Sequence, residues 1–185
     1  MKSLINSENF LVFDLSKLGT AYQIINSFVD SETLHVFEIS PIGAQAVLIL
    51  MSKDLVLLQL VHGQSLSLYK TEILNSVIIE KVDSKILNPY LSQPSLPNTE
   101  VKSNLLVLET NGFGVAFTKA KQLVDSGLDI IDFRAIRTCP PNLIITATSD
   151  SIEKLSMFVN QDTTSKVSII PKVQKSLRSY FEILS

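Results

Sequence analysis

The chain has one side chain with ready redox or metal chemistry, the thiol of Cys139, which is its only cysteine. Thiolates bind zinc and iron–sulfur clusters, but such sites need about four ligands, so one chain cannot build one from Cys139 alone. The guanidinium of Arg137, two residues earlier, would favour the thiolate. His35 and His62 lack a cysteine or carboxylate at metal-ligand spacing and are predicted to be ordinary packed or surface residues. Metal chemistry is therefore predicted only where several copies of Cys139 meet.

Sequence motifs for catalysis or nucleotide binding are weak. Gly112, Phe113 and Gly114 follow a predicted strand and open a predicted helix, as in a dinucleotide-binding loop. Phe117 stands where the third glycine of that loop is needed. The serine-rich residues 65–67 lack a nucleophile elbow. Because no acid, base and nucleophile converge in the pattern, the chain is predicted not to be an enzyme.

The composition is typical of an assembling protein. Of 185 residues, 45% are hydrophobic and only 18% are charged, which indicates that much of the nominal surface is subunit interface. The net charge of −2, without a basic run, indicates neither nucleic acid nor an anionic membrane as a partner. The first nine residues lack an apolar signal core, and the longest apolar run, 44–61, is broken at 52–54. One cysteine fits a reducing compartment, so the chain is predicted to be soluble and cytoplasmic.

Much of the sequence occurs twice. Five residues recur at one constant offset: Gly19, Ala21, Val29, Asp30 and Ser31 return as Gly114, Ala116, Val124, Asp125 and Ser126. Their helical spacing predicts one buried face in each half, formed by Tyr22, Ile25, Phe28 and Val29 and by Phe117, Ala120, Leu123 and Val124. We therefore expect two superimposable folded units.

Each half is predicted to run β-α-β-β-α-β-α. Strands are expected at 10–15, 34–39, 46–51 and 77–80, and again at 105–109, 128–136, 143–147 and 167–170. Helices are expected after the first strand of each half, at 53–61 and 151–159, and at the end of each unit. Prolines predict loops at 40–44 and 137–142 and a linker around residues 94–97. The predicted domains are residues 1–92 and 104–185, joined by a linker at 93–103.

Two short motifs frame each half. The second half opens with Leu106-Val107-Leu108-Glu109-Thr110 and ends with Ile169-Ile170-Pro171-Lys172, and the first half keeps this pattern more loosely as 13–15 and 78–81. With this order of elements, the chain resembles the bacterial microcompartment shell domain, in the tandem-domain class that forms trimeric pseudo-hexamers. The resemblance implies an α/β fold of α+β type, with two tandem microcompartment-like domains related to the ferredoxin-like fold. It also implies a structural role, as a homotrimeric tile with a central pore, assembled with other shell proteins in a microcompartment shell in the cytoplasm.

The resemblance further implies which residues line the pore, because in the family the loop between the second and third strands surrounds it. The pore-lining residues would be Ser40, Pro41, Ile42 and Gly43 from the first half and Arg137, Thr138, Cys139 and Pro140 from the second. Cys139-Pro140 is similar to a pair with which some members hold an iron–sulfur cluster on the three-fold axis, although that pair lies in their first repeat. Two alternatives stay open: Cys139 ligates a cluster shared by the trimer, or it is an inert thiol in a pore or core.

The edge residues depart from the family pattern. Asp30 and Asp125 stand where family hexamers usually carry a lysine just after the first helix. The usual arginine and histidine of the ending are replaced around Lys81 and Lys172. Like carboxylates repel across an edge, so the pure protein is predicted to tile poorly into sheets and to join shell proteins with lysine-rich edges.

A second class of protein fits the same order of elements. Tandem ferredoxin-like regulatory domains, which bind amino acids or other small ligands, also consist of split β-α-β units. The endings 78–81 and 169–172 favour the shell protein, because the simpler regulatory unit needs neither such an ending nor a terminal helix.

Overall fold

The computed structural model describes residues 8–29, 32–91, 100–136, 141–161 and 165–178. The chain divides into two compact units that interleave in sequence. The first unit comprises residues 1–82, 112–118 and 137–141, and the second comprises 83–111, 119–136 and 142–185. The domain boundaries expected from the sequence, at 92 and 104, stay a prediction.

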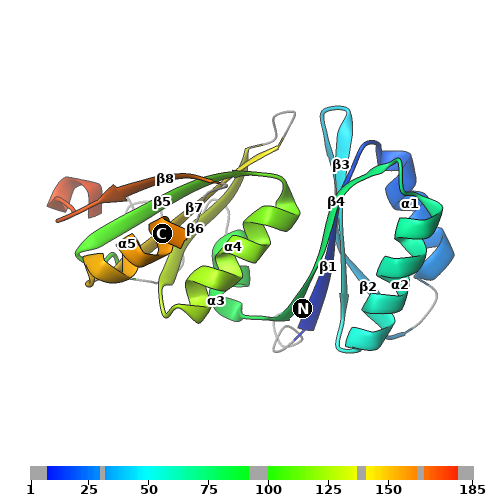
Figure 1. The fold of residues 1–185 in the computed structure, drawn as a ribbon, viewed down its shortest axis with the longest axis horizontal. Helices are drawn as coiled ribbons and strands as arrows, with labels where there is room; N and C mark the ends of the chain where they lie inside the picture. The colour runs from blue at the N-terminus through cyan, green and yellow to red at the C-terminus, as the bar shows by residue number, and fades with distance from the viewer. Residues whose placement is uncertain (1–7, 30–31, 92–99, 137–140, 162–164, 179–185) are drawn as a thin grey trace. The chain divides into compact units, whose positions relative to one another are not determined.

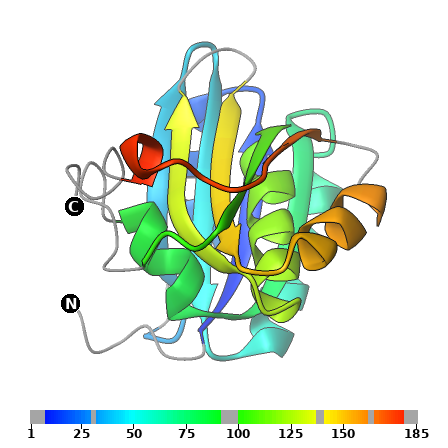
Figure 2. The same cartoon turned by 90° about the vertical axis from the view of Figure 1, so that its left-hand side faces the viewer.

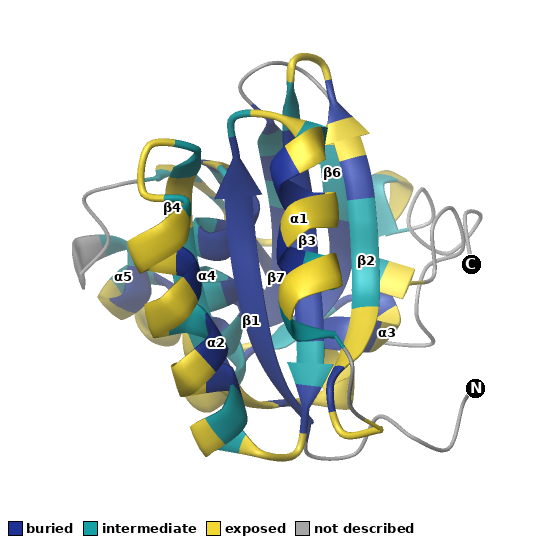
Figure 3. Cartoon of the chain, turned by 90° about the vertical axis from the view of Figure 1, so that its right-hand side faces the viewer, coloured by how far each residue is buried: buried dark blue, intermediate teal, exposed yellow. Residues whose placement is uncertain are grey.

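The first unit contains a four-stranded antiparallel sheet and two helices (Figure 1). Its elements are β1 (Glu8–Leu15), α1 (Leu18–Phe28), β2 (His35–Ile42), β3 (Gln45–Ser52), α2 (Leu55–Leu68) and β4 (Ile73–Val82). The strands lie in the order β2-β3-β1-β4, so the apolar strands β1 and β3 take the central positions. Helices α1 and α2 lie over one face of this sheet with their outer sides exposed (Figure 3). This is the split β-α-β order of a ferredoxin-like fold.

The second sheet repeats this order. The remaining elements are α3 (Ser84–Leu91), β5 (Asn104–Asn111), α4 (Phe113–Asp125), β6 (Asp129–Ile136), β7 (Asn142–Ser149), α5 (Ile152–Gln161) and β8 (Lys166–Ile170), coloured green to red in Figure 2. The strand order β6-β7-β5-β8 is equivalent to that of the first sheet. Two tandem ferredoxin-like sheets with helices confirm the fold class predicted from the sequence. No helix in the described ranges is long and apolar enough to cross a membrane.

Strand registers show that the two sheets are copies. Asn9 pairs with Ser52 in the first sheet, and Asn104 pairs with Ser149 in the second. The two asparagines differ by the offset of 95 that relates Gly19 to Gly114, and the two serines differ by 97. A register shift follows Val36 in β2, and an equivalent shift follows Ile130 in β6. A bulge conserved between both copies changes which side chains face each side of the edge strand. The duplication therefore extends from sequence to strand pairing.

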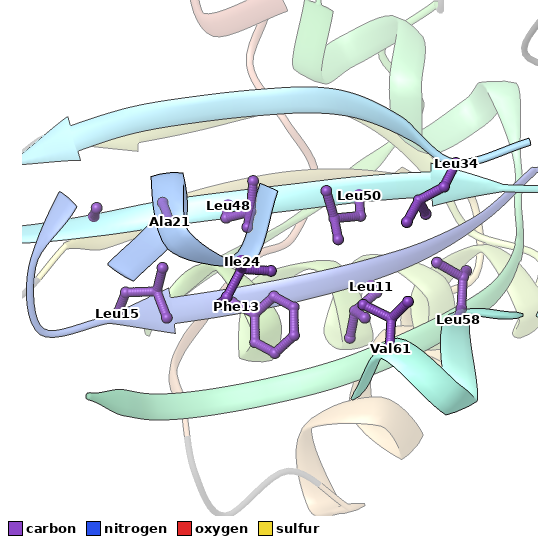
Figure 4. Close-up of a cluster of buried hydrophobic side chains, with 11 residues drawn as sticks. Leu11, Phe13, Leu15, Ala21, Ile24, Leu34, Leu48, Leu50, Leu58 and Val61 are labelled. Atoms are coloured by element: carbon purple, nitrogen blue, oxygen red, sulfur yellow. The ribbon is translucent and has the colours of Figure 1, made fainter. Parts of the chain in front are cut away.

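A buried apolar cluster joins the first sheet to its two helices (Figure 4). The cluster contains Leu11, Phe13, Leu15, Ala21, Ile24, Leu34, Ala46, Leu48, Leu50, Leu58 and Val61. Leu11, Phe13 and Leu15 alternate along β1, so they share one face of the sheet. Ala21 and Ile24 meet them from α1, with Ile25 and Phe28 packed alongside.

The helix face predicted from the repeat is partly wrong. Tyr22 is 57% exposed, although Ile25, Phe28 and Val29 are half-buried as part of the packed side. In the second half Phe117, Ala120 and Leu123 are fully buried and Val124 is half-buried. The stripe that faces the first sheet is spaced as 21, 24, 25 and 28, and Tyr22 lies about 100° away from Ala21 around the helix.

The loop predicted at 40–44 is shorter than expected. Ser40, Pro41 and Ile42 belong to β2 and pair with Val47, Ala46 and Gln45 of β3, which leaves Gly43 and Ala44 as a two-residue turn. Gly43 has φ of 60°, as a type II′ hairpin turn requires at its first position. Because β2 is an edge strand, the missing donor of Pro41 breaks no central ladder.

Candidate functional site

Several residues predicted to line a pore lie outside the described part of the chain. These are Arg137, Thr138, Cys139 and Pro140, and the edge residue Asp30 is outside it as well. Among the described residues no group of three histidine, cysteine or acidic side chains is arranged to hold a metal ion. The iron–sulfur cluster and the second-half pore loop therefore stay predictions.

A side-chain hydrogen bond joins two residues of β2 at the start of the first-half pore segment. Ser40 Oγ donates to Glu38 Oε1 over 2.8 Å, and Ile42 is buried whereas Pro41 and Gly43 are exposed. The second sheet repeats this pair of positions, because Arg134 Nε donates to Asp132 Oδ1 over 2.8 Å. Burial raises the pKa of Asp132, and the hydrogen bond from Arg134 opposes that rise. On the strand that leads into each hairpin, a carboxylate thus accepts a hydrogen bond from the side chain two residues later.

The edge carboxylate of the second half is paired within its own helix. Lys121 Nζ lies 2.6 and 2.7 Å from the two carboxylate oxygens of Asp125, four residues along α4. Such a pair is solvent-exposed and stabilises the helix by only a few tenths of a kcal/mol. It does partly neutralise the position at which the family pattern has a lysine.

Lys81 and Lys172 are equivalent in backbone conformation as well as in sequence. Their φ angles are 49° and 51°, and they are the described non-glycine residues with positive φ. This left-handed conformation costs a residue with a Cβ about 1–2 kcal/mol. Each is held there by an asparagine: Lys81 N donates to Asn9 Oδ1 over 2.9 Å, and Lys172 N donates to Asn104 Oδ1 over 3.2 Å.

These two asparagines were missed in the sequence and form a matching corner in each unit. Asn9 Nδ2 also donates to the carbonyl oxygens of Ser52 and Lys53, over 3.2 and 3.1 Å. Asn104 Nδ2 donates to those of Ser149 and Asp150, both over 3.1 Å. Each asparagine side chain therefore joins the first strand of its unit to the residues just before α2 or α5. It also joins that strand to the ending of the unit, at Lys81 or Lys172. The signal was present, because Asn9 and Asn104 differ by the same offset of 95 as the glycines.

A buried carboxylate, also missed in the sequence, receives the start of α4. Asp14 Oδ1 accepts the N–H of Phe113 over 2.9 Å, and Asp14 Oδ2 accepts that of Gly114 over 3.2 Å. Asn75 Nδ2 donates to the same Oδ2 over 3.3 Å. Burial raises the pKa of Asp14, and the three hydrogen bonds pull it the other way. Asp14 thus caps a helix that begins about a hundred residues later in the chain, within the first unit.

The fold and these duplicated corners define a class: a tandem-domain protein of two ferredoxin-like α+β units. No family model and no curated protein matches the sequence. Among solved structures the chain is similar to a microcompartment protein from Desulfitobacterium hafniense DCB, with 14% identity and a TM-score of 0.72 over 93% of this chain and 98% of that one. A glycine cleavage system transcriptional repressor reaches a TM-score of only 0.32 at 11% identity, over 89% and 98% of the two chains. At these identities the first likeness shows the fold.

Proposed function

We propose that this protein is a structural shell protein of a bacterial microcompartment and that it forms a homotrimeric tile. The observation that carries the proposal is the likeness of fold to the microcompartment protein, which spans nearly the full length of both chains. A chain with two similar units needs only three copies to place six units around an axis. The tile would act by assembly and by its central pore, not by catalysis.

Exposed apolar side chains on helix α2 support lateral packing. Val56, Leu60 and Leu68 are 73%, 55% and 63% exposed, whereas Leu58 and Val61 on the other side of the same helix are buried. A helix that is apolar all round is typical of a buried helix. We infer that the outer side of α2 is covered when the protein assembles.

The finer parts of this proposal follow the sequence. The two hairpin loops would face the pore, with Cys139 as the candidate ligand of an iron–sulfur cluster shared by three chains. The carboxylate edges, represented by Asp125, would select neighbouring shell proteins whose edges carry lysine. Such a tile would be found in the shell of a microcompartment within the cytoplasm.

Size-exclusion chromatography with light scattering tests the proposal. A trimer has about three times the 20.5 kDa mass of the chain. Electron microscopy should then show extended sheets when a lysine-edged shell protein is mixed with the chain, and few sheets from the chain alone. A monomer or dimer that binds an amino acid would contradict the shell role and support the tandem regulatory protein.

A further inference from the structure

Helix α2 contacts the first sheet through a polar pair of side chains at its middle. His62 Nε2 and Ser76 Oγ on β4 share a hydrogen bond of 2.8 Å, and the ring centroid of His62 lies 6.1 Å from that of Phe13 on β1. Both members of the pair are half-buried. Within the described part of the chain this is the only hydrogen bond of the imidazole. A protonated imidazole has two N–H donors, so one of them would have no protein partner here.

The C-terminal half of α2, residues 62–68, is weakly held to the sheet, and we call it the α2 latch. The buried apolar residues of the helix, Leu58 and Val61, precede it and face the sheet in Figure 4. Ser65 is fully buried, and its hydroxyl has no hydrogen-bond partner among the described residues, which destabilises the closed helix. Gly63 lies inside the helix, where glycine is less favourable than alanine. Three adjacent features thus favour local opening of the latch.

Helix α5 is the counterpart of α2 and has a valine in place of the histidine. Asp54 Oδ1 and Ser151 Oγ each accept the backbone N–H three residues later, so the two helices align at an offset of 97. At this offset Val159 is the counterpart of His62. An aliphatic side chain cannot bind a proton, so α5 lacks the titratable group of α2.

The strand partner of the histidine is replaced in the same way. Ser76 pairs with Phe13 across β4 and β1, and Val167 pairs with Leu108 across β8 and β5. Phe13 and Leu108 differ by the offset of 95 that relates the two sheets, so Val167 is the counterpart of Ser76. The first unit therefore has a histidine and a serine where the second unit has two valines.

The surroundings of His62 are apolar. Helix α2 has no acidic or basic residue and contacts β1, β3 and β4. The ionisable residues on these strands are Glu8, Asp14, Glu80 and Lys81. Asp14 receives the start of α4 on the other face of the sheet, and the other three lie about 13 Å or more along the strands from Phe13 or Ser76. Burial lowers the pKa of His62, and no nearby charge among the described residues opposes this effect.

We propose that the α2 latch responds to protons: protonation of His62 releases residues 62–68 from β4, whereas α5 has no such response. The charged ring is unfavourable against the apolar sheet and regains water when the latch opens. Because the open form binds this proton more tightly than the closed form, the closed form should lose stability as pH falls below about 6.5. The latch lies within the first unit, so the inference holds whether or not the chain forms a tile.

Hydrogen exchange of the whole chain, followed by mass spectrometry, tests the latch. It is measured at about pH 7.5 and about pH 5.5, on either side of the ordinary titration of histidine, with exchange times scaled for the intrinsic pH dependence of amide exchange. After scaling, peptides over residues 62–68 should exchange about threefold or more faster at the lower pH, because a one-unit difference in pKa between two forms shifts their equilibrium about tenfold. Peptides over α5 should not change. His62→Val with Ser76→Val gives the first unit the residues of the second and should abolish the response.

His35→Gln is the matched control, because His35 is the other histidine of the chain and is exposed on β2. This variant should keep the response, and its spectrum assigns the ring signals of His62 in NMR. If the double valine variant does not fold, the NMR titration of the unsubstituted chain decides: the midpoint of His62 should lie below that of the same ring in the urea-unfolded chain. A His62 midpoint at or above the unfolded value overturns the inference. So does a lack of faster exchange at 62–68, an equal change in α5, or a response that persists in the double variant.

Discussion

Removing the corner asparagines should cost each unit a similar, calculable amount of stability. The Asn9→Ala change deletes three hydrogen bonds: two donated to the carbonyls of Ser52 and Lys53, and one accepted from the N–H of Lys81. At about 1 kcal/mol net for each bond, the free energy of unfolding should fall by about 3 kcal/mol. Asn104→Ala deletes the three equivalent bonds and should cost the same.

The backbone conformation of Lys81 provides a second test of the same corner. Its left-handed φ of 49° is held by the bond from its own N–H to Asn9, so Lys81→Gly should relieve about 1 kcal/mol of strain. Urea unfolding followed by circular dichroism measures each change as a shift of midpoint at constant slope. The exposed helical residue Asn26 is a matched control, and Asn26→Ala should change stability by less than about 0.5 kcal/mol. A loss below about 0.5 kcal/mol for Asn9→Ala, or a destabilised Lys81→Gly, would refute the reasoning.

Three further predictions follow from the same structure. Gly114→Ala should lower the free energy of unfolding, measured in urea, by about 1–3 kcal/mol, because the added Cβ meets Asn75. Gly19→Ala should raise the stability of the unassembled chain by up to about 1 kcal/mol, because its Cβ meets nothing. Equal effects of the two substitutions would contradict the difference in packing. Burial holds the pKa of the Asp14 carboxyl above its usual range, so the folded state binds this proton more tightly than the unfolded chain does. Stability should therefore fall as pH rises through the raised pKa. Asp14→Asn should flatten that slope, and an unchanged slope would assign it to other groups. Protein reconstituted anaerobically with iron and sulfide should be brown, with about one cluster per trimer. The Cys139→Ser variant should be colourless but still trimeric. If the unsubstituted protein is colourless, the cluster prediction is wrong and the pore holds no cluster.

The sequence predicted the repeated elements well because apolar patterning and strand register follow the same rule in both halves. The strand expected at 10–15 lies within β1. The offset of 95 separates Asn9 from Asn104, which each pair with a serine in their own sheet. The ends of helices were predicted less accurately. The helix expected at 53–61 is α2, which begins at Leu55 and continues to Leu68. Its N-cap is Asp54, whose Oδ1 accepts the N–H of Leu57. Local pattern alone does not show where a helix that is apolar all round ends.

The candidate site was harder to predict because it depends on contacts distant in sequence. Asp14 reads as an ordinary strand residue until its carboxylate is seen to accept the N–H groups of Phe113 and Gly114. Tyr22 fits an apolar helix face by spacing, but the sheet buries the stripe that includes Ala21 and Ile24 instead. Which of two equivalent surfaces is covered follows from tertiary structure, and a repeat makes the two surfaces look alike in sequence.

Electron microscopy of the purified particle tests the central claim most directly. If three copies of a tandem chain form the tile, two-dimensional averages should show a flat particle with six similar lobes around a central hole, of which alternate lobes are identical. A particle that contains one or two copies of the chain would contradict the account. So would a six-lobed particle whose mass equals that of six chains.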